Sequence, residues 1–211
     1  MENLAVFDFD GTITRHDSFP RFILHVYKKN RFSLLVKILL FLIPIILTKL
    51  NIASTDKIKE RLYISLFNRL TIDDLRRKCK SFIPSINRDL SPLITERIKR
   101  HQRLGHKIII ISASLRELIQ PWADSHGITH IIATEIKRDN ENHLCGFASP
   151  NCNGPEKVRR LKEFLGPDTE RYHITGYGNS SNDYPLLKFC QNSYIHKHKI
   201  LSDRYEIIPF K

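Results

Sequence analysis

Apolar residues are spaced along the chain in two different patterns, and the first pattern predicts buried strands. Five short runs rich in β-branched residues stand apart from their surroundings: Leu4 to Phe9, Lys107 to Ile111, Ile131 to Ala133, His173 to Thr175 and, more weakly, Ser193 to Ile195. Runs that are apolar without alternation are typical of strands covered on both faces. Between the later runs, apolar spacing predicts helices over Leu115 to Ser125 and Pro155 to Leu165. Strands that alternate with helices predict a parallel sheet, and therefore an α/β fold.

The second pattern is found in residues 17–104, which contain no convincing strand signal. Apolar residues recur there at helical spacing in three stretches: Phe19 to Tyr27, Ile58 to Leu70 and Leu93 to Leu104. We therefore expect an α/β core of residues 1–16 and 105–211, with an all-helical cap of residues 17–104 inserted between the first and second strands.

One segment of the cap, residues 32–50, is much more apolar than the rest. The run Phe32 to Leu47 contains Lys37 and Pro44, and its flanks are basic: Lys28, Lys29, Arg31 and Lys49. A helix that spans a bilayer needs about 20 mostly apolar residues, so a clean span is disfavoured. Two interpretations stay open, which are a helix buried in the cap and an interfacial or re-entrant membrane anchor with basic flanks.

Composition and charge narrow the class of protein. The chain has 211 residues, 41% of them apolar, which suits one substantial core and excludes wholesale disorder. Lys and Arg outnumber Asp and Glu by 34 to 22, which gives a net charge of +12 and favours an anionic partner. Nucleic acid is disfavoured, because the basic residues are scattered and the aromatic residues do not interleave with them.

Cysteine usage and the N-terminus indicate the compartment. None of the four cysteines forms a CxxC pair, so reduced thiols are expected. The first residues lack the basic start, apolar stretch and cleavage site of a secretory signal. We expect a cytoplasmic location, either free or attached peripherally or by an anchor to the inner face of the membrane.

Two carboxylates follow the first predicted strand. In the string AVFDFDGT, Asp8 and Asp10 are two residues apart, and side chains two apart on a strand point to the same side. Ligands of parallel sheets bind beyond the carboxyl ends of the strands, where this pair would lie. Two crowded carboxylates repel each other, and a hard divalent cation such as Mg²⁺ removes that cost. Capping of a turn by Asp-Gly is the structural alternative.

Three further segments fall where the same crevice would need them. The run KIIIISAS ends in Ser112, Ala113 and Ser114 before a helix, so hydroxyl and N–H groups can face an anion there, although plain N-capping is the alternative. Lys157, in the first turn of its helix, can offset the charge of a phosphoryl group or be a solvated surface lysine. The loop after His173 to Thr175 carries Asn179 and Asp183 as oxygen donors, of which Asp183 can also cap a helix.

In this order, the four segments resemble the motifs of the haloacid dehalogenase-like phosphatase superfamily, and the helical insertion matches the cap of its phosphoserine-phosphatase-like branch. The fragments ISAS, IIATEIKR, CNGPEK and GYGNSSNDYPLLKFCQ, with the basic Leu-rich run of the cap, are similar to the bacterial phosphatidylglycerophosphate phosphatases of this fold. The resemblance implies a Rossmann-like core.

The resemblance also implies a reaction and a set of site residues. Asp8 would be the nucleophile of a covalent aspartyl-phosphate mechanism and Asp10 the general acid and base. Phosphate would be held by Ser112, the N–H of Ala113, and Lys157. Mg²⁺ would be held by Asp8, the carbonyl of Asp10 and Asn179, with Asp183 near it. Asn179 departs from the family pattern, because the family usually has an aspartate at this position. One negative charge fewer should weaken metal binding and make Asp183 more important as a metal ligand.

Three functional hypotheses follow. The first is an Mg²⁺-dependent phosphomonoester hydrolase acting on a phosphorylated lipid headgroup, phosphatidylglycerophosphate in particular. The second keeps the enzyme and makes the substrate a small soluble phosphate ester, as in the phosphoserine-like branch. The third is a weakly active module that binds phosphate or membrane, suggested by Asn179. Arg15, His16 and Arg116 are candidates for contact with the leaving group. The oligomeric state is not predicted.

Overall fold

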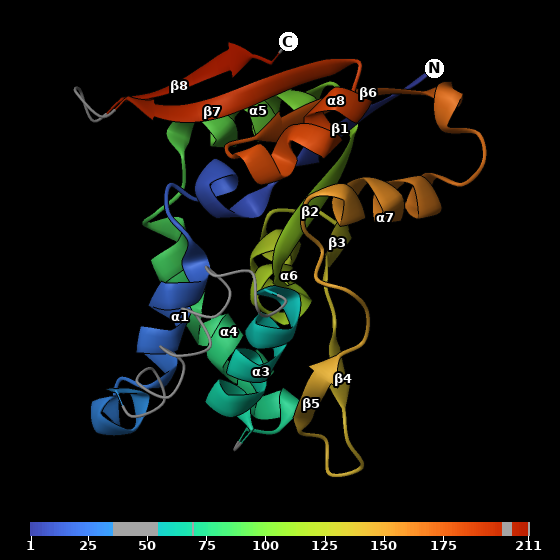
Figure 1. Cartoon of the computed structure of the whole chain (residues 1–211). Coiled ribbons are helices and arrows are strands. Elements are labelled where there is room, and N and C mark those ends of the chain that lie inside the picture. Colours follow the sequence, from blue (N-terminus) through green and yellow to red (C-terminus); the bar gives the residue numbers. More distant parts are fainter. Residues whose placement is uncertain (36–54, 69, 200–203, 211) are drawn as a thin grey trace.

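A six-stranded sheet forms the centre of the computed structural model, which describes residues 1–35, 55–68, 70–199 and 204–210. The strand order is β3-β2-β1-β6-β7-β8, parallel throughout except that β8 runs antiparallel to β7 (Figure 1). The bounds are β1 Glu2–Phe7, β2 Lys107–Leu115, β3 His130–Thr134, β6 Tyr172–Gly178, β7 Asn192–Lys199 and β8 Arg204–Pro209. The predicted α/β fold with a Rossmann-like, mostly parallel sheet is confirmed.

Helices cover both faces of this sheet. Their bounds are α1 Ser18–Val26, α3 Thr55–Phe67, α4 Ile72–Asn87, α5 Pro92–Arg103, α6 Arg116–Ser125, α7 Pro155–Leu165 and α8 Tyr184–Phe189. The described residues also form three single turns: η1 Phe9–Ile13, η2 Thr169–Arg171 and η3 Ser181–Asp183. A separate antiparallel hairpin is formed by β4 Ile136–Arg138 and β5 Leu144–Phe147.

The uninterrupted apolar strands are explained by two buried clusters, one on each face of the sheet. Along β1, Ala5 and Phe7 point into the cluster that includes α5 and α6, whereas Leu4 and Val6 point into the cluster that includes α7 and α8. Since both faces are covered from Leu4 onward, every position from Leu4 to Phe7 is apolar and no alternation appears there.

The described residues between β1 and β2 are mostly helical, as predicted, and form much of one end of the molecule. Helices α1, α3 and α4 lie together there with the β4–β5 hairpin, opposite the end that carries β7 and β8 (Figure 1). Helices α1, α3 and α5 correspond to the three predicted stretches. Helix α5 packs against β2 and β8, so this part of the insertion lies on the sheet. The limits proposed for cap and core stay a prediction.

Four elements, α4, β4, β5 and β8, have no counterpart in the sequence predictions. Helix α4 buries Ile72, Leu75, Cys79, Phe82 and Ile86 at helical spacing, but Pro84 within it breaks the usual sequence signal. The strands β4, β5 and β8 are short or polar, so an apolar alternation does not mark them, although each pairs with its neighbour along the chain.

The apolar segment of the cap falls mostly outside the described residues, which omit 36–54. The choice between a buried helix and a membrane anchor for Phe32 to Leu47 therefore stays open. Within the part of the chain that the structure describes, no helix combines the length and the hydropathy needed to cross a membrane.

A buried histidine joins α5 to the sheet. The Nε2 atom of His101 lies 3.0 Å from the hydroxyl oxygen of Tyr177 on β6, and the Nδ1 atom of His101 lies 2.8 Å from Nδ1 of His106. Two ring nitrogens at this distance can share only one proton, so at least one imidazole must be neutral. Burial, together with His106, Arg100 and Arg97, lowers the pKa of His101 to about 4.

This histidine should make the fold acid-sensitive. Because the folded pKa of about 4 lies below the ordinary value of 6.5, the unfolded chain binds more protons between these values, and stability falls as pH drops through that window. We expect the melting temperature of His101→Gln to fall less steeply than that of the wild type between pH 6.5 and pH ~4.5. His173→Gln, at the start of β6, should keep the wild-type slope. Equal slopes for wild type and His101→Gln would contradict this account.

Candidate active site

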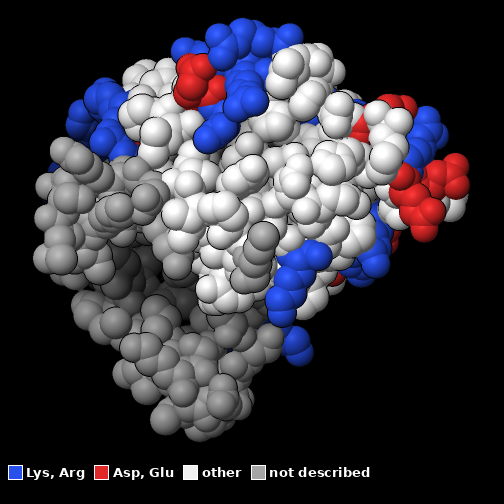
Figure 2. Space-filling view, turned by 90° about the horizontal axis from the view of Figure 1, so that it is seen from above, with Lys and Arg blue, Asp and Glu red and all other residues white. Residues whose placement is uncertain are grey.

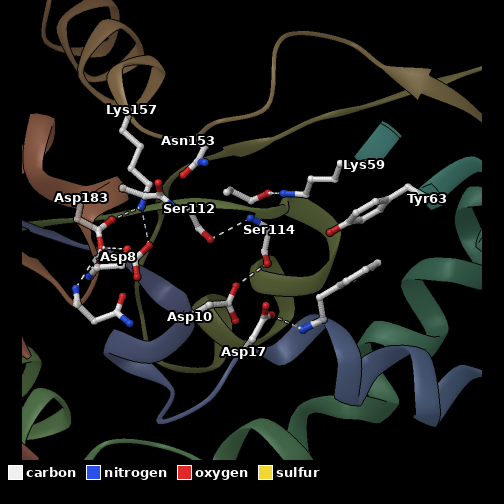
Figure 3. A pocket seen from close by; sticks show the side chains of 15 residues that line it. Asp8, Asp10, Asp17, Lys59, Tyr63, Ser112, Ser114, Asn153, Lys157 and Asp183 are labelled. Atoms are coloured by element: carbon white, nitrogen blue, oxygen red, sulfur yellow. Dashed lines mark hydrogen bonds and ion pairs between the residues drawn. The ribbon is translucent and has the colours of Figure 1, made fainter. Parts of the chain in front are cut away.

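A buried ammonium group links three segments at the carboxyl edge of the sheet. Lys157 Nζ, in the first turn of α7, lies 2.6 Å from Asp8 Oδ1 and 2.6 Å from Asp183 Oδ1 (Figure 3). Asp8 directly follows β1, and Asp183 ends the η3 turn after β6. Lys157 is only 2% exposed and Asp183 only 1%. The solvated-lysine alternative is therefore wrong, and the three groups form a buried ion triad.

The charge states within the triad follow from burial and from the pairing. Burial raises the pKa of Asp8 to about 7, with Lys157 opposing and Asp183 adding to the shift. Burial acts against the charge of Lys157, but Asp8 and Asp183 offset it and hold the pKa above its ordinary value. Burial also acts against the charge of Asp183, yet Lys157 and the backbone N–H groups of Ser180 and Asn179 keep its pKa below the ordinary value. Asp8 is thus the carboxylate whose charge is least stabilised in the absence of a further cation.

Asp183 shapes its own loop as well as binding the lysine. Its second oxygen, Oδ2, accepts hydrogen bonds from the N–H of Asn179 at 3.1 Å, the N–H of Ser180 at 3.0 Å and the hydroxyl of Ser180 at 3.0 Å. The capping predicted for Asp183 is therefore present, together with an ion pair to Lys157 that the sequence did not predict.

The residues after β1 form a tight turn rather than a continued strand. The strand ends at Phe7, and Phe9–Ile13 form one turn in which Gly11 has a positive φ of 78°. Asp8 and Asp10 therefore do not converge by strand alternation, as the sequence spacing suggested; the turn brings both to one cavity. A Cβ on Gly11 would lie 2.2 Å from Nδ2 of Asn179, so only glycine allows the two loops to approach this closely.

Two side-chain oxygen atoms from different loops, one of Asp8 and one of Asn179, lie beside the hydroxyl of Thr12. Its hydroxyl lies 3.0 Å from Asp8 Oδ2 and 3.3 Å from Asn179 Oδ1. This places the Asn179 amide oxygen beside the Asp8 carboxylate, where the predicted cation ligands were expected to gather.

A bulge at the end of β2 turns three small residues toward the same cavity. Ser112 pairs with Ala133 of β3, but the next paired residue is Leu115, opposite Thr134, so Ala113 and Ser114 are extra. Bulges re-aim side chains and are frequent next to active sites. Here the Ser114 N–H donates to Ser112 Oγ at 3.0 Å, which closes the turn.

Residues of the insertion form the outer wall. Lys59 of α3 donates to the carbonyl of Ala113 at 2.9 Å and to Asn151 Oδ1 at 2.8 Å, which ties the insertion to the bulge. Phe19 of α1 stacks on the buried ring of Tyr63 at a centroid distance of 4.2 Å. Asp17 caps α1, and burial followed by the charge of Asp10 raises its pKa.

These side chains enclose a cavity of about 260 Å³ (Figure 3). The lining residues are Asp8, Asp10, Asp17, Phe19, Lys59, Tyr63, Ser112, Ala113, Ser114, Asn153, Lys157, Asn179, Ser180, Asn182 and Asp183. The structure thus brings together every site residue predicted from the sequence. Which role each has in chemistry stays a prediction.

The residues suggested for the leaving group lie elsewhere. Arg15 and His16 face Asp89, with His16 Nδ1 at 2.8 Å from its carboxylate. Arg116 donates to the carbonyl of Ile131 at 2.7 Å. None of the three lines the cavity, and the suggestion is therefore wrong for this structure.

Several lining residues were missed from the sequence. Asp17, Phe19, Lys59 and Tyr63 come from the inserted helices, whose position over the sheet edge cannot be derived from local pattern. Ser114 was within the noted ISAS run, and its hydroxyl spacing from Ser112 was the available signal.

The lining suits a divalent cation. It contains four aspartates and two lysines, so two negative charges are left without a counter-charge if all ionise. Among the described residues, no three His, Cys, Asp or Glu side chains form a metal cluster. However, Mg²⁺ is commonly held by one or two carboxylates with waters and substrate oxygens, and the Asp8 and Asn179 oxygens beside Thr12 fit that pattern. Both oxygens of Asp183 accept hydrogen bonds, as do both oxygens of Asp8, so the shift of metal binding onto Asp183 stays a prediction.

Comparison with known proteins gives a family match over most of the chain. The model of haloacid dehalogenase-like hydrolases matches residues 5–188. The chain is 31% identical to protein CicA of Caulobacter vibrioides, over 87% of this chain and 81% of the relative. It is 24% identical to a histidinol-phosphatase of Neisseria meningitidis serogroup C, over 89% of this chain and 87% of the relative.

Solved structures share the fold at low identity. A protein of unknown function from Bordetella pertussis Tohama I has a TM-score of 0.77 at 18% identity, covering 92% of this chain and 89% of that one. A phospho-aspartyl intermediate analogue of phosphoserine phosphatase has a TM-score of 0.54 at 14% identity, covering 91% and 85%.

The close approach at Gly11 gives a test of the site. In Gly11→Ala the new Cβ forces the Asn179 side chain away from Thr12, so we expect activity to fall at least about tenfold. Gly105→Ala is a matched control, because it has a similar φ of 67° with no atom within 4 Å of the added Cβ. Both variants should lose about 1 kcal/mol of stability from the left-handed backbone. Equal activity in the two variants would show that the Asn179 position is unimportant.

Proposed function

The chain belongs to the haloacid dehalogenase-like hydrolase family, as its motifs predicted, and we propose that this phosphatase hydrolyses a small soluble phosphate monoester through an aspartyl-phosphate. The observation that carries the proposal is the buried triad, which fixes Asp8 at the cavity floor beside an ammonium group. The solved phospho-aspartyl intermediate analogue of phosphoserine phosphatase, which shares this fold, supports the covalent route.

The proposed roles follow from where each side chain lies. Asp8 attacks phosphorus, and a new bond forms between its oxygen and phosphorus as the ester oxygen departs. Asp10 gives a proton to that oxygen and later takes one from the attacking water. Lys157 offsets the repulsion between the anionic nucleophile and the anionic substrate, while Ser112 and the N–H of Ala113 hold phosphate oxygens.

Mg²⁺ is the proposed cofactor. Asp8, the carbonyl of Asp10 and Asn179 would hold it, with Asp183 adjacent through Lys157. When bound, the ion supplies positive charge that neutralises the phosphoryl group during transfer. Asn179 contributes an amide oxygen without charge, so we propose weaker metal affinity than an aspartate would provide.

A soluble substrate is favoured by the relatives and by the cavity. The Neisseria relative is a histidinol-phosphatase, and phosphoserine phosphatase has the same fold. The cavity of about 260 Å³ is closed on one side by Phe19, Tyr63 and Lys59, which suits a compact leaving group.

A phosphorylated lipid headgroup is the second candidate. Leu24, Phe32 and Leu35 are exposed large apolar residues, and Lys28, Lys29 and Arg31 lie among them next to the part of the chain outside the description. Basic residues near an anionic leaflet favour membrane attachment. The opposite end of the molecule, over β7 and β8, is the one shown in Figure 2, and on its described part Lys and Arg form separate groups with uncharged residues between them.

Replacing the nucleophile tests the enzyme function. Asp8→Asn keeps the shape and a hydrogen-bond acceptor for Lys157, and we expect its turnover of 4-nitrophenyl phosphate with Mg²⁺ to fall at least about a thousandfold. Asp124→Asn, an exposed change on α6, should retain wild-type turnover. Intact-mass measurement after acid quenching should detect a phosphorylated chain only where Asp8 is present. Equal background rates in wild type and Asp8→Asn would instead support the non-catalytic phosphate- or membrane-binding module.

A substrate panel tests the substrate class. We expect amino-alcohol phosphates such as phosphoserine and histidinol phosphate to have higher kcat/KM than phosphatidylglycerophosphate in mixed micelles, each measured as phosphate release. Addition of EDTA should abolish turnover and excess Mg²⁺ should restore it. Preference for the lipid by tenfold or more would reverse the choice between the two candidates.

A further inference from the structure

The carboxylate of Asp10 is held at both oxygens by donors from two different elements. The N–H of Ser18, the first residue of α1, donates to Oδ1 at 2.8 Å. The hydroxyl of Ser114, in the β2 bulge, donates to Oδ2 at 2.5 Å (Figure 3). Neither contact involves Asp8, Lys157 or Asp183, so the Asp10 carboxylate is held by hydrogen bonds that are separate from the buried triad.

The backbone around Ser114 does not depend on its hydroxyl. The turn is closed by the Ser114 N–H donating to Ser112 Oγ, and the neighbouring Ala113 carbonyl is held by Lys59 and Thr134. Among the described residues, the Ser114 hydroxyl has its hydrogen bond to Asp10 alone. The side chain is buried at the cavity wall, and its orientation is given by the bulge.

The two donors differ in what they can do when Asp10 changes its protonation state. A backbone N–H can only donate, so the contact with Ser18 favours an unprotonated Oδ1 of Asp10, which accepts this hydrogen bond in both protonation states of the carboxyl group. A hydroxyl can donate to a carboxylate and can accept from a carboxylic acid. Ser114 can therefore keep its contact with Oδ2 in both states, which a methyl group could not.

We infer that Ser114 is a positioning residue for the acid–base step, and this rests on the proposed function. Its hydroxyl keeps the Asp10 carboxyl in one orientation at the cavity throughout the reaction. In the first step the Asp10 proton passes to the leaving oxygen as the phosphorus–oxygen bond of the ester breaks and the Asp8–phosphorus bond forms. In the second step water gives its proton to Asp10 while its oxygen bonds to phosphorus and the Asp8–phosphorus bond breaks.

This role has a signature that a merely structural role lacks. A weakly basic aryloxide leaves without protonation, whereas a more basic one needs the acid, which contributes typically about 10²–10⁴-fold. Loss of Asp10 positioning should therefore harm poor leaving groups most. A general loss of packing should harm all esters of similar shape equally.

The experiment compares 4-nitrophenyl, phenyl and 4-methoxyphenyl phosphates, which have similar shapes and increasingly basic leaving groups. For Ser114→Ala we expect kcat/KM to fall at least tenfold more on the phenyl and methoxyphenyl esters than on the nitrophenyl ester. Ser193→Ala on β7, which removes a hydroxyl bonded to the Phe210 carbonyl, should leave all three rates unchanged. An equal loss on all three esters would overturn the inference while leaving the proposed function intact.

A double-mutant cycle tests whether Ser114 acts through Asp10. In an Asp10→Asn background, Ser114→Ala should cause no further loss on any ester, because the group it positions is gone. A further loss equal to that in the wild type would overturn the inference. The shape-matched pair Ser114→Thr and Ser114→Val provides the same comparison if the alanine variant folds poorly, with the hydroxyl of Thr expected to retain activity on phenyl phosphate. If the wild type hydrolyses none of the esters, the proposed function itself fails.

Discussion

A buried ammonium between two buried carboxylates is the constraint on which the rest of the site depends. Taking charges out of water is costly, and removing one partner of such a group typically costs about 3–5 kcal/mol because the others are left uncompensated. The end of β1, the start of α7 and the loop after β6 are therefore held at one point by Lys157. Once these three segments meet, the Gly11 turn and the Asn179 loop must lie against each other, and the oxygen donors at Thr12 follow from that approach.

The sheet order makes this meeting unavoidable. Strand β1 lies between β2 and β6, so the chain leaves β1 toward one edge of the sheet and returns on the other side of it. A crevice forms at the carboxyl ends of the strands where the order reverses. The β2 bulge narrows that crevice by adding Ala113 and Ser114 to its wall. The inserted helices then complete it with the aromatic and charged side chains of Phe19, Tyr63 and Lys59.

Local pattern was sufficient for the elements that are buried on both faces and for the motifs at their ends. The strands around Val6, Ile109 and Ile174 are apolar because two layers of helices cover them, and glycine and proline mark the limits of α7. Other features depend on contacts between distant residues. The exposure of Lys157 could not be predicted, since a lone lysine in a first helical turn is usually solvated. Similarly, Asp10 reaches the cavity through a turn with positive φ at Gly11, and Tyr63 and Lys59 reach it only because the insertion folds back over the bulge.

The hydrogen bond from Lys59 to the Ala113 carbonyl connects the insertion directly to the bulge at the end of β2. Lys59 lies near the start of α3, whereas the carbonyl that it holds belongs to the same short bulge that carries Ser112 and Ser114. Because the same ammonium group also donates to Asn151 Oδ1, a single side chain ties the start of α3 to two separate segments of the core, and the position of the insertion is linked to the shape of the bulge.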